Sequence, residues 1–455
     1  MEENFKMNEE DDVNQLLIIG NGFDLQCGLR SKFTDYFKYV KRKMNEQDKT
    51  ILKGNEISCG NILPHSDFYL NYASFWDCYF LSLELLEDNQ DYDWCNVEKQ
   101  IEILLTSNKN ENIGEINGKI LFDLLYLGSL NGLTNLKFHS QLNNMMKKQI
   151  KSKIQNGNQI SLVENIINKL SFYISLSLDK RIQDNLKNND NLNELISNYK
   201  PIFYSYLFKQ LEKFENNLKA YLQLLFQKKE STDSKANKEN NAISCSEVAM
   251  DFSYYLQCYR KILYKITEGN KYNLLSFNYT YFSKALLSTT LSLGMISPVV
   301  ERMHPINCVV SKNIHGDLDG HIIIGIDELS INESDPLYRF TKTYRILGLE
   351  DHEESCLSKS IKEVIFYGHS LAKADYSYFQ SIFDFYHIYD SNVKLIFYYS
   401  NYCNNKEKCK FETVNRVIKL IKTYGNTLNN KDHGKNLLHK LKLENRLIIK
   451  ELKDW

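Results

Sequence analysis

The sequence predicts an α/β fold in which a parallel sheet carries a large all-helical insertion. Residues 16–19 (LLII) form a short unbroken apolar run, which is typical of a strand buried on both faces of a parallel sheet. A glycine turn follows at once, and comparable runs of strand and helix return only after residue 270. The long stretch between them has helical spacing, so we expect a Rossmann-like sheet that an insertion interrupts.

The first strand leads into a glycine-rich turn and then a helix. The candidate ligand-binding positions of this turn are Gly20, Asn21, Gly22, Phe23, Asp24 and Gly28. A helix is predicted from residue 31, with Ser31 as its N-cap. Free amides at such a strand–turn–helix junction can bind a phosphate. The third glycine lies eight residues after the first rather than five, and a simple tight turn is the alternative.

Four segments follow from composition and periodicity. Residues 14–50 are predicted to begin the α/β domain, residues 65–268 to form the helical insertion, and residues 228–246 to be a mobile loop within it. Residues 270–403 are predicted to complete the α/β domain, and residues 404–455 to form a charged helical tail.

One position in the insertion is a candidate for the site. A helix is predicted to begin after Asp93, and Glu98 lies one turn after Trp94. Trp94 and Glu98 could therefore line a pocket. The alternative for Glu98 is a first-turn acid that the helix dipole favours.

Small or polar residues end the predicted strands at 272–277, 306–310 and 363–367. The residues concerned are Ser276, Asn278, His315, Gly316, Gly368 and Ser370. Because ligands bind outside the carboxyl ends of the strands in open α/β sheets, these clusters are expected to line one crevice. Asn278 could instead cap the next helix, His315 could be a buried structural histidine, and His369 is expected to be structural or on the surface.

Composition restricts the partners. The formal net charge of the 455 residues is −1, which argues against a nucleic acid partner. No apolar run is long enough for a membrane span, and the acidic first residues do not resemble a signal peptide, so we expect a cytoplasmic protein. The 10 cysteines form no C-x-x-C pair, so no zinc is expected. Asp317, Asp319, Asp327 and Glu328 could form a cation site, but a polar turn explains them equally well.

Four motifs carry a resemblance to a known family. The stretches GNGFDLQCGL, SFNYT, NIHG and YGHSLAKADYSYF resemble those of the bacteriophage abortive infection AbiH family. That family is in turn similar to sirtuins and to sirtuin-like defence proteins that hydrolyse NAD. The resemblance implies a sirtuin-like sheet with Asn278 positioning ribose or water and His315 acting as the base. It also assigns NAD contacts to Gly20, Asn21, Gly22, Phe23, Asp24, Gly28, Ser276, Gly316, Gly368, Ser370 and Asp375.

These observations favour an anti-phage protein that binds NAD as substrate or ligand and acts as an NAD⁺ glycohydrolase. Thr280 stands where sirtuins carry an acid that helps to hold nicotinamide, which puts the orientation of the cofactor in doubt. The alternative is a non-catalytic module that senses a nucleotide or binds a phage component through the helical insertion. A nuclease is a third, weaker alternative. The phage trigger is unknown, and a homo-oligomer is possible.

Overall fold

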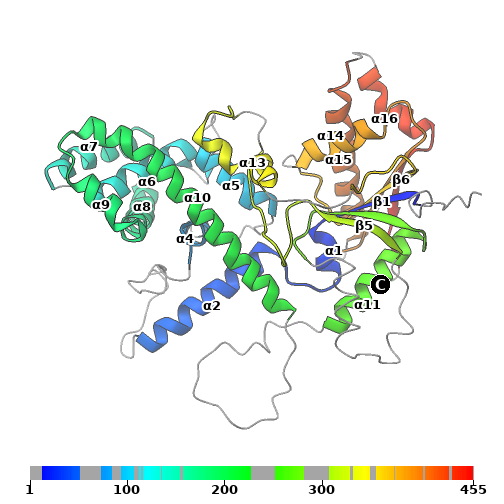
Figure 1. Ribbon diagram of the computed structural model, residues 1–455, viewed down its shortest axis with the longest axis horizontal. Helices are drawn as coiled ribbons and strands as arrows, with labels where there is room; N and C mark the ends of the chain where they lie inside the picture. The colour runs from blue at the N-terminus through cyan, green and yellow to red at the C-terminus, as the bar shows by residue number, and fades with distance from the viewer. Residues whose placement is uncertain are drawn as a thin grey trace, which may run out of the picture.

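The computed structural model shows an α/β domain joined to a large helical region (Figure 1). It describes residues 13–51, 73–84, 94–106, 112–113, 116–134, 136–153, 157–226, 252–280, 307–327, 331–348, 355–372, 375–402, 405–429 and 433–453. The predicted loop at 228–246 lies outside this part of the chain. None of the helices in the described part is long and apolar enough to cross a membrane.

Six parallel strands form the sheet. They are β1 (Gln15–Ile19), β4 (Tyr272–Ser276), β5 (Cys308–Asn313), β6 (Glu363–Tyr367), β7 (Lys394–Tyr399) and β8 (Leu447–Glu451). The spatial order is β5-β4-β1-β6-β7-β8, and every neighbouring pair is parallel. Numbered along the chain, this is the order 3-2-1-4-5-6 of a doubly wound, Rossmann-like sheet. The predicted α/β class and parallel sheet are therefore confirmed.

The central strand β1 explains why its sequence is so apolar. Leu17 is paired with Leu274 of β4 on one side and with Ile365 of β6 on the other. Successive side chains point to opposite faces, so Leu17 and Ile19 enter one core while Leu16 and Ile18 enter the other. Helices cover both faces, which leaves no position of β1 facing solvent.

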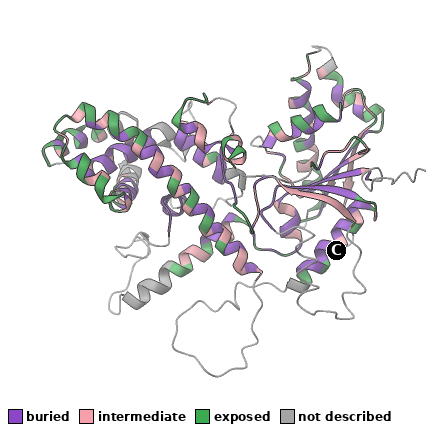
Figure 2. Ribbon diagram, viewed as in Figure 1, coloured by how far each residue is buried: buried purple, intermediate pink, exposed green. Residues whose placement is uncertain are grey.

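Helices cover the two faces as Figure 1 shows. One face packs against α1 (Asn21–Gln26) and α11 (Phe252–Thr267), while α2 (Phe33–Ile51) extends away from the strands into the helical region. The other packs against α14 (Tyr376–Phe385), α15 (Lys406–Gly425) and α16 (His433–Leu443). Figure 2 shows the resulting pattern, in which the inner strands β1 and β4 are buried, the edge strand β5 is half-buried, and the outer helices have exposed sides.

The core of the first face continues into the helical region. Its helices are α4 (Phe75–Glu84), α5 (Trp94–Thr106), α6 (Gly118–Leu133), α7 (Leu136–Lys153), α8 (Gly157–Ser177), α9 (Lys180–Lys187) and α10 (Leu192–Leu225). A short hairpin, β2 (Asn112–Ile113) with β3 (Ile116–Asn117), interrupts the predicted all-helical stretch. Buried Asp77 of α4 joins the parts, since it accepts hydrogen bonds from Tyr36 of α2 (2.6 Å) and Asn217 of α10 (2.9 Å).

One predicted segment differs from the structure. The predicted helical tail at 404–455 ends in a strand, β8, which pairs with β7 and completes the edge of the sheet. The cause is tertiary pairing with β7, which local periodicity does not report. Helix α11 lies at the end of the predicted insertion, and its Tyr259 packs against Phe23 of α1.

The predicted glycine loop is a tight crossing of two backbones. Helix α1 begins at Asn21, immediately after β1, and the Gly22 amide donates to the carbonyl of Gly368 at 2.7 Å. Gly368 has φ +71°, and a Cβ there would lie 2.3 Å from the amide nitrogen of Phe23. Glycine is required here because the turns after β1 and β6 touch through their main chains.

Candidate active site

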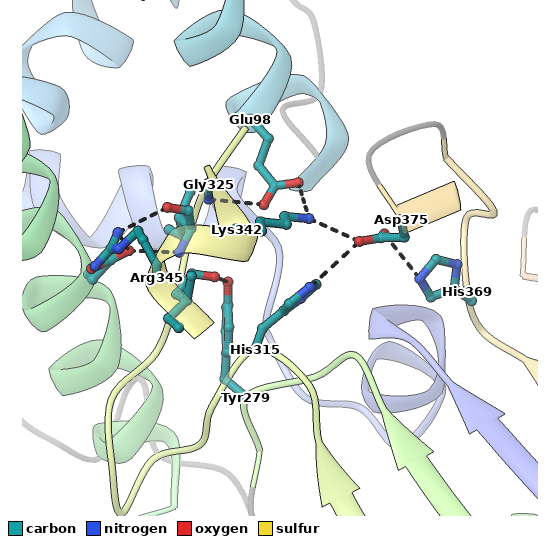
Figure 3. A network of polar contacts seen from close by, with 11 residues as sticks. Glu98, Tyr279, His315, Gly325, Lys342, Arg345, His369 and Asp375 are labelled. Carbon is teal, nitrogen blue, oxygen red and sulfur yellow. Dashed lines mark hydrogen bonds and ion pairs between the residues drawn. The ribbon is translucent and has the colours of Figure 1, made fainter. Parts of the chain in front are cut away.

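Five ionisable side chains meet at the carboxyl end of the sheet, as Figure 3 shows, and they come from five separate segments. They are Glu98 of α5, His315 after β5, Lys342 at the start of α13 (Lys342–Leu347), His369 after β6, and Asp375 before α14. Their side chains are only 5–11% exposed. Such a buried cluster needs internal partners for every charge that it keeps.

Lys342 is the centre of this cluster. Its Nζ lies 2.8 Å from Glu98 Oε2 and 2.9 Å from Asp375 Oδ1. Burial lowers the pKa of Lys342, but the two carboxylates outweigh burial and raise that pKa above its ordinary value. Burial raises the pKa of Asp375, whereas Lys342 and the two histidines lower it, and the net pKa lies below the usual range. Lys342 and Asp375 are therefore both charged.

Glu98 is held less firmly in its charged form. Its Oε1 accepts a weak hydrogen bond from the Gly325 amide at 3.4 Å. Burial raises the pKa of Glu98 to about 7, with Lys342 opposing this rise and Asp375 adding to it. Glu98 can therefore exchange a proton near neutral pH.

The short helix that carries Lys342 is anchored on both sides. Thr341 caps α13 by accepting from the Tyr344 amide at 3.2 Å. Arg345 forms a bidentate pair with buried Glu215 of α10, one contact being 2.7 Å from Nη2 to Oε2. Glu215 also accepts from the Ile324 amide at 2.7 Å. The position of Lys342 therefore depends on α10 and on the segment before α13.

The two histidines face Asp375 in different ways. The Nδ1 of His369 accepts from the Leu371 amide at 2.9 Å, so the ring proton is on Nε2, which lies 3.3 Å from Asp375 Oδ2. His315 Nε2 lies 3.7 Å from Asp375 Oδ1, beyond hydrogen-bond distance. Burial, and secondly Lys342, lower the pKa of His315 to about 3, so the ring is neutral. Phe277 packs against both rings, with centroids 4.5 Å from His369 and 5.5 Å from His315.

Asn278 lies between β1 and β5. Its Nδ2 donates to the carbonyl of Gly20 at 3.1 Å, and its amide donates to Ser276 Oγ at 3.1 Å. Asn278 Oδ1 and His315 Nε2 are both buried and have no hydrogen-bond partner among the described residues. Buried polar atoms in native proteins are nearly always bonded, so a water or a ligand group would satisfy these two atoms.

Several other predicted residues have structural partners instead. Phe23 is in the core, with its ring centroid 4.9 Å from that of Tyr259. Asn21 accepts from Ser31 Oγ at 2.5 Å, so the Ser31 hydroxyl serves this contact rather than the predicted N-cap. Gly28 has φ +85° in the turn that ends α1. These three predicted ligand positions shape the turn after β1.

Asp24 is the most buried of the predicted ligand positions that carry a charge. Its carboxylate accepts from Tyr255 at 2.8 Å and from Thr280 at 2.9 Å. Thr280, which departs from the sirtuin pattern, is therefore a partner of the turn after β1.

The predicted phosphate cradle is partly occupied by the protein itself. The amides of Gly22 and Phe23 donate to the carbonyls of Gly368 and Gly20. Gly316 is required by its own turn, since it has φ +77° and a Cβ would lie 1.7 Å from the carbonyl oxygen of His321. Ser370 is exposed, and the Trp94 side chain lies outside the described part of the structure.

Sequence reasoning missed two members of the cluster. His369 was expected to be structural or on the surface, but its side chain is buried against Asp375. Its place at the end of a predicted strand was a usable signal. Lys342 had no such signal, because nothing in its local sequence indicates its two carboxylate partners. Within the described residues, no group of three or more His, Cys, Asp or Glu side chains could hold a metal, and Asp317 caps a turn by accepting from Asp319 and Gly320.

Comparison with known proteins finds a family model that matches part of the chain. Residues 16–202 match the model of the family described as bacteriophage abortive infection AbiH. The resemblance expected from the sequence is confirmed over this range, which spans β1, α1 and much of the helical region. The motifs around Asn278, His315 and Gly368 lie outside the matched range. No curated protein matches the sequence.

Proposed function

We propose, from the AbiH match over residues 16–202, that this chain acts in abortive infection and that its sheet edge binds NAD and hydrolyses the nicotinamide–ribose bond. The observation that carries the proposal is the pair of unpartnered buried atoms, Asn278 Oδ1 and His315 Nε2, at the ends of β4 and β5. The doubly wound strand order supports it, since dinucleotides bind at this edge in such sheets.

The chemistry would proceed through a ribosyl cation. The bond from C1′ to the nicotinamide nitrogen breaks, and its electron pair stays on the nicotinamide, which leaves neutral. The oxygen of a water molecule then forms a bond to C1′, and one proton of that water passes to His315 Nε2. The products are ADP-ribose and nicotinamide, and the proton is later released to solvent.

Each side chain has a defined task in this scheme. The Asp375 anion stabilises the cation at C1′ and the imidazolium that forms on His315, whose ring burial and Lys342 otherwise hold neutral. The free oxygen of Asn278 accepts a hydrogen bond from a ribose hydroxyl or from the attacking water. The ammonium of Lys342 already pairs with Asp375 and Glu98, so we assign it no contact with the diphosphate of NAD.

The test uses the purified chain incubated with NAD, alone and with lysate of phage-infected cells as a source of the trigger. We expect nicotinamide and ADP-ribose to accumulate, and His315→Gln and Asn278→Ala to abolish both this release and phage protection. His439→Gln, at an exposed position of α16, is the matched control and should behave as wild type. Absence of nicotinamide in every condition, with protection intact in both variants, would refute the enzyme.

A sensing module is a second candidate that one observation favours. Lys342 joins Glu98 of the helical region to Asp375 beside the sheet, so a ligand at the sheet edge could alter the contacts of the helices. This candidate predicts that calorimetry detects NAD binding without nicotinamide release. It also predicts that Glu98→Gln reduces phage protection.

A further inference from the structure

We infer that Lys342 is a positioning residue of this site, which directs one oxygen of Asp375 toward His315 and keeps that carboxylate charged. The inference rests on the proposed function and deepens it. Nothing in the family match bears on Lys342, because the matched residues end at 202.

The contacts of Asp375 assign a task to each of its oxygens. His369 holds Oδ2 at 3.3 Å, and its own Nδ1 is fixed by the Leu371 amide. The other oxygen, Oδ1, lies 2.9 Å from Lys342 Nζ and 3.7 Å from His315 Nε2. The carboxylate is therefore held from both sides, and its rotation toward His315 depends on Lys342 and His369 together.

The charges around Asp375 explain why an ammonium is needed there. The groups that face it are Lys342, His315 and His369, with Glu98 and the neutral phenol of Tyr279 nearby. Glu98 and Asp375 are two buried carboxylates that share a single cation. Without that cation, Asp375 would lose the group that does most to lower its pKa, while its own burial and the neighbouring Glu98 would favour the protonated form.

A contribution to stability alone does not explain why Lys342, Glu98 and Asp375 are buried together as charged groups. Burying charges costs desolvation energy that their attraction often fails to repay, and apolar residues can replace such groups without loss of stability. Here the charged groups include Asp375, whose Oδ1 lies 3.7 Å from His315 Nε2, a buried atom without a hydrogen-bond partner among the described residues. A role in directing Asp375 accounts for both features.

The experiment compares Lys342→Met with Lys359→Met, whose lysine is exposed and away from the cluster. The readouts are histidine titration by NMR with ¹⁵N-labelled rings and the rate of nicotinamide release. In Lys342→Met we expect His315 to titrate at higher pH than in wild type, because the ammonium that lowers its pKa is gone. We expect kcat to fall about a hundredfold, since misdirected catalytic groups cost on this order, with little change in KM.

A second variant keeps the test decisive if Lys342→Met does not fold. Lys342→Met/Glu98→Gln removes one positive and one negative charge together, so it leaves fewer unpaired buried charges, and the same shift of His315 is expected. Lys342→Arg should restore the wild-type titration of His315. Unchanged titration and unchanged kcat in a folded Lys342→Met or double variant would overturn the inference. If wild type releases no nicotinamide, the proposed function fails, whereas the titration still decides the role of Lys342.

Discussion

Asp24 illustrates how burial sets the charge of a carboxyl group at the level of a single residue. It is 1% exposed and accepts hydrogen bonds from Tyr255 and Thr280. Burial raises the pKa of Asp24 to about 6, and the two hydroxyl groups only partly offset this rise. Asp24 therefore connects the turn after β1 to α11 and to the end of β4 at an electrostatic cost near neutral pH.

This cost predicts a pH-dependent contribution to stability. The folded-state pKa of Asp24 is raised above its ordinary value of 3.8 to about 6, so the folded protein binds this proton more tightly than the unfolded chain. Protonation of Asp24 therefore adds to the free energy of unfolding at low pH, and this contribution is lost as the pH rises through about 6. The loss between about pH 5 and about pH 8 is about 1.4 kcal/mol. The amide introduced by Asp24→Asn does not ionise, so this substitution should remove that part of the slope. Urea unfolding of both proteins at both pH values tests it, and parallel pH dependences would contradict the assignment.

Among the single elements, strand β8 shows how a segment late in the chain completes the sheet. It pairs in parallel with β7, and the preceding residue, Arg446, is 4% exposed. The Arg446 guanidinium donates to the carbonyls of Ile388 (2.8 Å) and Tyr389 (3.3 Å) in the connection before β7. The segment around β8 therefore also fixes the path of the chain into its neighbour.

Replacing Arg446 should destabilise the sheet edge more than replacing a surface lysine. Arg446→Met leaves buried carbonyls without donors, for which we expect a loss of about 2–4 kcal/mol in the free energy of unfolding. Lys450→Met is the control on β8, where the lysine pairs with Glu268 at 3.4 Å and both side chains are well exposed. Its expected effect is below about 1 kcal/mol. Chemical denaturation measures both, and equal effects would show that Arg446 does not hold this connection.

At the scale of the whole molecule, the helical region and the sheet share a continuous core and also meet at the charged cluster. The core runs from β1 through α2 and α4 to α10. Figure 3 shows Glu98 reaching Lys342 from the helical side and Asp375 reaching it from the sheet side. A ligand at the sheet edge would therefore be bordered by both parts of the protein.

Hydrogen exchange with and without NAD tests this arrangement across the chain. We expect slower exchange in β1 with α1, in β4, in β6 and in α5, because these elements carry or border the proposed site. Helices α7 to α9 lie at the far end of the helical region in Figure 1 and should be unaffected. Protection confined to α7–α9, or none at saturating NAD, would contradict a nucleotide site at the sheet edge.

The sequence by itself determined the α/β class, the central strand and the junctions after β1, β4, β5 and β6. These were predictable because buried parallel strands require continuous apolar runs and the close backbone crossing of Gly22 with Gly368 requires glycine. The AbiH resemblance could likewise be predicted from the motif that contains Gly20 and Gly28, which lies within the matched residues.

Only the tertiary structure decided the charged cluster and the place of β8. Lys342 lies 33 residues from Asp375, and Gly325 lies 227 residues from its partner Glu98, so no local pattern records these contacts. Tertiary folding brings these groups together, and their burial shifts the pKa values of Glu98 and His315 in opposite directions. The physical reason is that desolvation and charge pairing depend on which segments meet in space, whereas periodicity reports only which face of a segment is apolar.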